Sequence, residues 1–177
     1  ASTITSIYNS GEPTDLSAFS KMSLNFDGVD DTIDVGTTSL GITTAISVSA
    51  WVKIPTTDTG GGGTNIRMIV CEDTTSGGQR DWLLFWRGTG YNYFQGSIFH
   101  TDGSSSAVNS TGITPNDGNW HHLLLSFDGT TDANGLKMYV DGTLFQATAG
   151  STGIFSYSGT EPAIGSLTSG GGWFFEG

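Results

Sequence analysis

The densest group of residues that could bind a ligand is a run of aspartates near the start of the chain. It comprises Asp27, Asp30, Asp31 and Asp34. Hard cations such as Ca²⁺ prefer several oxygen ligands, which the carboxylates and carbonyls of one turn can supply. The spacing differs from that of the helical calcium loop, and the alternative is a hairpin whose aspartates bond their own backbone.

A second candidate site is the aromatic segment that begins at Trp82. Exposed Trp and Tyr rings stack on sugar faces through their apolar bodies, while their polar tips make hydrogen bonds. The alternative is a core strand, because large aromatic side chains are usually buried. This alternative weighs more for Trp82 and Trp86, which share one strand face, than for Tyr91 and Tyr93. The candidate ligand-binding residues are Trp82, Trp86, Arg87, Tyr91 and Tyr93.

The sequence does not favour an enzyme. Glycoside hydrolysis needs two carboxyl groups at one sugar bond, and residues two apart on a strand share a face, but no Asp or Glu has another two residues away. His121 and His122 are consecutive, so on a strand their side chains leave opposite faces and cannot bind one metal ion together. Cys71, on an apolar strand, is typical of a small buried hydrophobe. A carboxylate pair assembled from different strands stays open, and no catalytic residue is assigned.

The elements that must position these residues are strands, because apolar residues recur with period two along most of the chain. In Ile46–Ile54 the even positions are apolar and three of the four odd positions are polar or charged, which predicts a half-buried strand. Asp-Gly and Asn-Gly pairs suit the tight turns between such runs. This pattern indicates an all-β, two-sheet antiparallel sandwich or a barrel. The other predicted strands are 22–26, 66–72, 81–86, 94–101, 123–127, 136–140 and 143–147.

One short helix is expected at the start of the chain. Ser2 or Thr3 can cap it, Gly11 can end it, and Pro13 prevents its continuation. The length of 177 residues suits one domain. The sequence contains no apolar run of membrane-spanning length, and we expect no leader peptide.

The composition excludes several classes of partner. The chain has 6 Lys+Arg against 17 Asp+Glu and a formal net charge of −11. Nucleic-acid binding needs clustered cations, and the same deficit disfavours heparin and anionic membranes. The single cysteine, Cys71, excludes an internal disulfide and a cysteine-based zinc cluster.

Several motifs together resemble the laminin-G-like domains of the concanavalin A-like lectin/glucanase superfamily. In the family's order, they are LNFDGVDDTIDV at 24–35, AISVSAWVK at 45–53, NWHHLLLSFDG at 119–129, MYVDG at 138–142, AIG at 163–165 and WFFEG at 173–177. The resemblance covers almost the whole chain and implies two stacked antiparallel sheets in a jelly roll. It also implies a calcium ion held by the turn after FDG, which here contains Asp27, Asp30 and Asp31, with further ligands from a terminal strand.

The chain departs from the family pattern at both ends. The strand that usually comes after F-x-G is missing beyond Gly177, whereas residues 1–17 resemble the segment C-terminal to that strand in the family. We therefore divide the chain into an N-terminal helix and linker, 1–19, and a β-sandwich lacking its final strand, 20–177. The neighbour of a missing strand shows unpaired backbone groups, so we expect a strand from another chain or segment to complete the sheet.

The segment IYNSGEPTDLS at 7–17 is similar to the ends of laminin-G-like modules in virion proteins of tailed phages. The resemblance predicts a non-enzymatic binding or structural module, displayed on a virion or outside a cell as part of an oligomer or larger assembly. Its expected partners are host glycans or neighbouring virion proteins, with no nucleic acid and no membrane insertion. One alternative is a calcium-dependent carbohydrate-binding domain (a lectin) of a secreted bacterial protein. The other is a glycoside hydrolase or lyase on the same fold.

Overall fold

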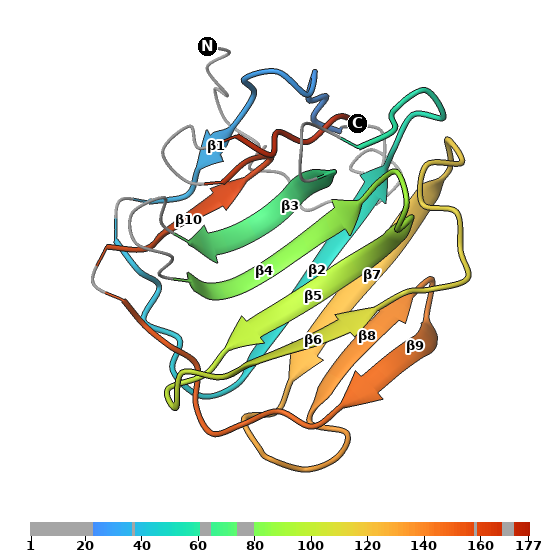
Figure 1. Cartoon of the computed structure of the whole chain (residues 1–177). Helices are drawn as coiled ribbons and strands as arrows, with labels where there is room; N and C mark the ends of the chain where they lie inside the picture. The colour runs from blue at the N-terminus through green and yellow to red at the C-terminus, as the bar shows by residue number, and fades with distance from the viewer. Residues whose placement is uncertain (1–22, 37, 61–64, 74–79, 158, 168–171) are drawn as a thin grey trace, which may run out of the picture.

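The computed structural model describes residues 23–36, 38–60, 65–73, 80–157, 159–167 and 172–177. They form two antiparallel sheets that pack face to face (Figure 1), which confirms the predicted all-β sandwich. The predicted N-terminal helix and the 1–19 segment lie outside the described residues. Within the described ranges, no helix is long and apolar enough to cross a membrane.

The larger sheet has six strands in the order β1-β10-β3-β4-β5-β6. Its strands are β1 (Ile33–Asp34), β3 (Ile66–Asp73), β4 (Arg80–Arg87), β5 (Tyr93–Phe99), β6 (Ser105–Asn109) and β10 (Glu161–Ile164). The long strands β3 and β4 pair antiparallel, with bulges near Ile69 and Asp73. These irregularities set which side chains of β3 point into the core.

The smaller sheet has four strands in the order β2-β7-β8-β9, and it lies behind the larger sheet in Figure 1. Its strands are β2 (Ile46–Lys53), β7 (Trp120–Phe127), β8 (Leu136–Val140) and β9 (Thr143–Thr148). β2 and β7 pair antiparallel along their full length without a bulge. The β8–β9 turn places Asp141 and Gly142 at φ of 51° and 77°, a conformation that suits the Asp-Gly pair found there.

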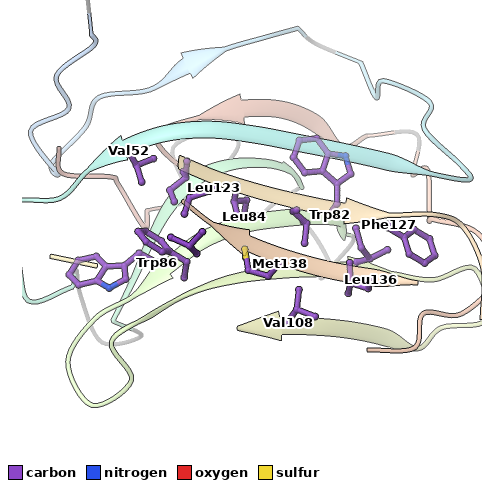
Figure 2. Close-up of a cluster of buried hydrophobic side chains, with 14 of the residues drawn as sticks. Val52, Trp82, Leu84, Trp86, Val108, Leu123, Phe127, Leu136 and Met138 are labelled. Atoms are coloured by element: carbon purple, nitrogen blue, oxygen red, sulfur yellow. The ribbon is translucent and has the colours of Figure 1, made fainter. Parts of the chain in front are cut away.

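The main core lies between the two sheets (Figure 2). Trp82, Leu84 and Trp86 of β4 point into it, and they meet Leu123 and Met138 from the smaller sheet. The intervening residues of β4 point to the opposite face of the larger sheet, where a smaller apolar cluster forms. That cluster consists of Ile66, Met68, Cys71, Leu83, Phe85, Ala163 and Leu167. Cys71 is fully buried, as its apolar strand predicted.

The structure lacks one of the predicted strands and adds the short strands β1, β6 and β10 to them. Residues 23–26 form no strand; instead Asp27 makes a single antiparallel bridge with Glu176. The strand β6 was not predicted because, of its five residues, only Val108 is fully buried, so its apolar alternation is short.

Candidate functional site

The predicted metal-binding aspartates do come together in the fold. Asp27, Asp30 and Asp31 each offer a carboxylate oxygen, and these oxygens lie within 4.8 Å of one another at the surface. The alternative, a hairpin whose aspartates bond their own backbone, also holds in part. The backbone N–H groups of Val29 and Asp30 donate to Asp27 Oδ1 at 2.8 and 3.4 Å. The turn is therefore bonded internally and presents its carboxylates together.

Arg67 holds this turn against the C-terminal segment. Its Nη1 donates to the carbonyl oxygens of Gly28 at 3.1 Å and of Phe174 at 2.9 Å. Its Nη2 donates to Glu176 Oε2 at 3.1 Å. The donor set of the turn fits a calcium ion, since it consists of hard carboxylate oxygens. Asp27, Asp30 and Asp31 are the residues that would hold the ion, and its charge would offset their mutual repulsion.

The structure corrects the expectation that Trp82 and Trp86 contact a ligand. Their side chains are 3% and 1% exposed and lie in the core between the sheets, which excludes stacking on a sugar (Figure 2). Trp82 Nε1 donates to Glu72 Oε2 at 2.9 Å, so its polar end is bonded inside the protein. The other oxygen of Glu72 accepts the backbone N–H of Leu40 at 2.6 Å.

The remaining predicted ligand-binding residues form an aromatic corner at the end of β4. The guanidinium of Arg87 lies over the Tyr91 ring at 3.8 Å, and the Tyr91 and Tyr93 rings meet edge to face at 5.9 Å. Tyr91 is 50% exposed. Because Arg87 already occupies one face of the Tyr91 ring, the corner offers a sugar less open aromatic surface than separate rings would.

A larger open aromatic surface lies on the outer face of the four-stranded sheet. We define the sheet platform as the outward-facing side chains of Ser49, Trp51, Trp120, His122, Leu124 and Tyr139. Trp51 is 66% exposed and Trp120 is 47% exposed, although both belong to regular strands. Exposed large aromatics on a flat sheet face offer the geometry that stacks on apolar faces of ligands.

The side chains of the sheet platform are held in place by neighbours. The Trp51 and His122 rings are 5.1 Å apart, centroid to centroid, and Ser49 Oγ lies 2.8 Å from His122 Nε2. Asp141 Oδ1 accepts the backbone N–H of His122 at 2.8 Å, while His121 Nδ1 lies 2.8 Å from Asp141 Oδ2. Partial burial of Asp141 acts to raise its pKa, but the hydrogen bonds from His121 and His122 and the charges of these histidines outweigh burial and lower the pKa.

The two histidines diverge as the sequence predicted. His122 lies on the sheet platform, whereas the His121 ring packs edge to face with the core residue Phe94. The sequence reasoning did not single out Trp51 or Trp120 as binding residues. The signal was present, because Trp51 is the one apolar side chain among the outward-facing odd positions of Ile46–Ile54.

Two antiparallel sheets of six and four strands that pack face to face are the architecture of a concanavalin A-like β-sandwich. The family model described as "Concanavalin A-like lectin/glucanases superfamily" matches residues 27–177. The chain therefore belongs to this superfamily, in its laminin-G-like branch. A search of the curated proteins finds no match.

Among solved structures, the chain is similar to domains LG4-5 of the mouse laminin alpha1 chain, with a TM-score of 0.56 and 12% identity over 82% of this chain. It spans only 34% of that laminin chain. It is also similar to the CBM40 of the Ruminococcus gnavus IT-sialidase bound to α2,3-sialyllactose, with a TM-score of 0.55, 14% identity, and coverage of 87% and 86% of the two chains. A heptameric SAP-like pentraxin from Limulus polyphemus gives a TM-score of 0.51 and 15% identity, with coverage of 86% and 67%. At these identities the likeness establishes the fold.

Proposed function

We propose that the protein is a non-enzymatic, surface-displayed binding module that contacts glycans through the sheet platform. The observation that carries this proposal is the exposure of Trp51, 66%, in the middle of a regular strand. A tryptophan ring that faces solvent from a strand is removed from water only when a ligand or a partner stacks on it. Hydroxyl and imidazole groups of Ser49 and His122 lie beside the ring and could bond sugar hydroxyls.

The solved structures support a binding role. The Ruminococcus gnavus module is bound to a sialylated sugar, and the match to it extends over most of both chains. We carry over from this neighbour the general role of glycan binding, and the exposed ring of Trp51 is what supports the sheet platform as the proposed site.

The carboxylates support a role other than catalysis. Three buried ones are engaged in holding the fold. Asp58 bonds Arg67, Glu72 bonds Trp82, and Asp81 accepts the hydroxyl of Thr160 at 3.0 Å. A hydrolase or lyase needs carboxyl groups directed at a bound sugar, and these three are directed at the protein.

A glycan panel with matched variants tests the proposal. We expect the wild-type chain to bind immobilised glycans, and Trp51→Ala to lower the affinity at least tenfold, since removing the ring removes the stacking surface. Trp51→Phe, which keeps an aromatic ring, should retain most of the binding. Tyr91→Ala tests whether the aromatic corner of Arg87, Tyr91 and Tyr93 is the binding site instead. Binding that survives Trp51→Ala but is lost in Tyr91→Ala would overturn the platform as the site, and binding to no glycan would overturn the function.

Protein neighbours are the second class of partner we propose, as in a virion decoration or adhesion protein. Among the described residues, β2 pairs with β7 alone, so one edge of this eight-residue strand has no strand beside it. Gly177 lies against the carbonyl oxygen of Lys53, at one end of that edge. An unpaired edge is a template for an added strand, which a neighbouring polypeptide would supply in the assembled particle.

Hydrogen exchange tests strand addition. In the isolated chain, the backbone amides on the unpaired edge of β2 should exchange quickly, while the amides of β2 that are bonded to β7 should be protected. In purified particles, both sets should be protected. The virion location itself is tested by mass spectrometry of those particles. Unchanged exchange of β2 in an assembly that contains the chain would contradict strand addition.

We also propose that the turn bearing Asp27, Asp30 and Asp31 binds calcium. The support is their convergence at the surface and their oxygen chemistry. In this role the ion would stabilise the turn and its junction with the C-terminal segment.

A further inference from the structure

The unpaired edge of β2 presents backbone groups at every second residue. The carbonyl oxygen of Ile54, which directly follows β2, accepts the N–H of Gly118 on the β7 side at 3.2 Å. Because successive residues of a strand direct their N–H and C=O groups to opposite edges, the even-numbered residues of β2 bond β7. The backbone groups of Ser47, Ser49 and Trp51 therefore point to the edge at which no strand lies among the described residues.

One end of this edge is already occupied. The carbonyl oxygen of Lys53 belongs to the same series as those of Ser47, Ser49 and Trp51, but Gly177 lies against it. The backbone groups that an added strand can bond are therefore those of Ser47, Ser49 and Trp51. Ser49 is the middle residue of this series.

The same stretch of β2 leaves the core incompletely covered. Ile46 and Val52, near the two ends of the strand, face the core and are 9% and 4% exposed. Val48 and Ala50 lie between them on the same face, yet they are only partly buried. A strand added along the edge would remove these two side chains from water.

β2 lacks the features that usually keep a sheet edge unpaired. Natural edges are protected by charged side chains, prolines or bulges. β2 contains no proline and no carboxylate, and it pairs with β7 without a bulge. Its one charged residue, Lys53, is at the end that Gly177 occupies.

From these features we propose that a second copy of the chain occupies this edge, so that β2 pairs antiparallel with β2 of the copy about a two-fold axis at Ser49. The inference rests on the strand addition proposed above and names its partner. Each Ser49 lies opposite the other, and each Ser47 lies opposite Trp51 of the second copy. These three pairs give about six backbone hydrogen bonds, two for each pair.

The side chains of β2 are complementary to themselves in this register. On the core side, Val48 lies opposite Ala50 of the second copy, so the partly buried side chains cover each other. On the outer side, the large ring of Trp51 lies opposite the small Ser47. Lys53 lies opposite Ala45, so the two lysines do not face each other. The two four-stranded sheets join into one, with both sheet platforms on the same side.

Sedimentation of the full chain over a range of concentrations tests the inference, and we expect a dimer. Each copy has a net charge of −11, so added NaCl, which screens the repulsion, should increase the dimer fraction. Ser49→Pro removes an N–H on the free edge and leaves the β7 ladder intact, so it should raise the dissociation constant at least tenfold. Ser49→Thr, which keeps the N–H, should retain the dimer. Melting temperatures of dilute samples verify folding.

Cysteine cross-linking tests the register without a proline. Two Ser49→Cys residues would lie about 5.5 Å apart between Cα atoms, which a disulfide can span, so oxidation should give a covalent dimer. Two Ser47→Cys residues, four positions apart along the paired strands, would lie about 14 Å apart and should give none. Ser47 and Ser49 are both exposed, whereas the native Cys71 is fully buried.

Hydrogen exchange separates this inference from strand addition in general. The quick exchange expected at the free edge of β2 in the isolated chain applies to dilute samples, and dimerisation should slow it as concentration rises. A chain that stays monomeric, with its edge protected only in particles, overturns the second copy as partner and leaves strand addition standing. An edge protected in the monomer means that another segment of the same chain covers it, which also overturns the inference. An edge unprotected everywhere overturns both claims. A dimer that persists in Ser49→Pro and does not cross-link through Ser49→Cys overturns β2 as its interface.

Discussion

Replacing Arg67 by methionine tests how the edge of the sandwich is held together. The guanidinium makes a two-point contact with the buried carboxylate of Asp58, with Nε donating to Oδ2 and Nη2 to Oδ1, both at 2.9 Å. The other N–H groups reach the carbonyls of Gly28 and Phe174 and the carboxylate of Glu176. Methionine keeps the apolar stem and removes every one of these bonds.

The size of the effect depends on the burial of Asp58, which is 3% exposed. Removing one partner of a buried ion pair leaves a charge without compensation and costs about 3–5 kcal/mol. The lost carbonyl bonds add to this, but such terms overlap, so we expect Arg67→Met to lower the free energy of unfolding by about 4 kcal/mol. For a domain whose total stability is about 5–15 kcal/mol, this is a large loss.

Urea unfolding of four proteins measures this: wild type, Arg67→Met, Asp58→Asn and the double variant. Because Asp58→Asn removes the uncompensated charge, the double variant should be less destabilised than the sum of the singles, with a coupling of about 1.5 kcal/mol or more. A loss below about 1 kcal/mol in Arg67→Met, or a coupling near zero, would refute the role of the pair.

Three further predictions concern separate parts of the molecule. Burial raises the pKa of Asp81 from 3.8 to about 6, so between these pH values the folded state keeps a proton that the unfolded state releases. The free energy of unfolding should therefore fall as pH rises through this window, by about 3 kcal/mol at most. Asp81→Asn should remove that fall when urea unfolding is measured at a series of pH values. A methyl group at Gly96 would collide with the buried Leu125, so Gly96→Ala should cost about 1–3 kcal/mol in the same assay, whereas Gly36→Ala, which meets nothing, serves as the control and should cost under about 0.5 kcal/mol. Calcium should raise the melting temperature of wild type and not of Asp27→Ala, since a ligand stabilises only the state that binds it; an equal rise in both proteins would remove the turn as the calcium site.

The strands and the sandwich could be predicted from the sequence because alternation is a local property. In each of the strands β2, β7 and β8, the residues on the buried face are two positions apart in the sequence, so the pattern identifies that face. The convergence of Asp27, Asp30 and Asp31 was also accessible, since residues of one turn are close in space by necessity.

The parts that escaped prediction depend on contacts between distant segments. Trp82 and Trp86 alternate like any amphipathic strand, and only the second sheet packed over them decides that their face is the core. Trp51 has the same residue type and the opposite environment. The bonds from Arg67 to Asp58 and Glu176 join residues that the sequence alone does not bring together, and no spacing rule reveals them.

The antiparallel contact between Phe26 and Gly177 has a mechanical consequence. The two residues exchange both backbone hydrogen bonds, at 2.8 and 3.0 Å, so two segments far apart in the sequence are joined by a short clasp. A pull that separates these two segments loads the clasp before it reaches the long ladders of either sheet. The clasp would open bond by bond at low force, so the module would lengthen slightly under tension while the four-stranded sheet stays folded.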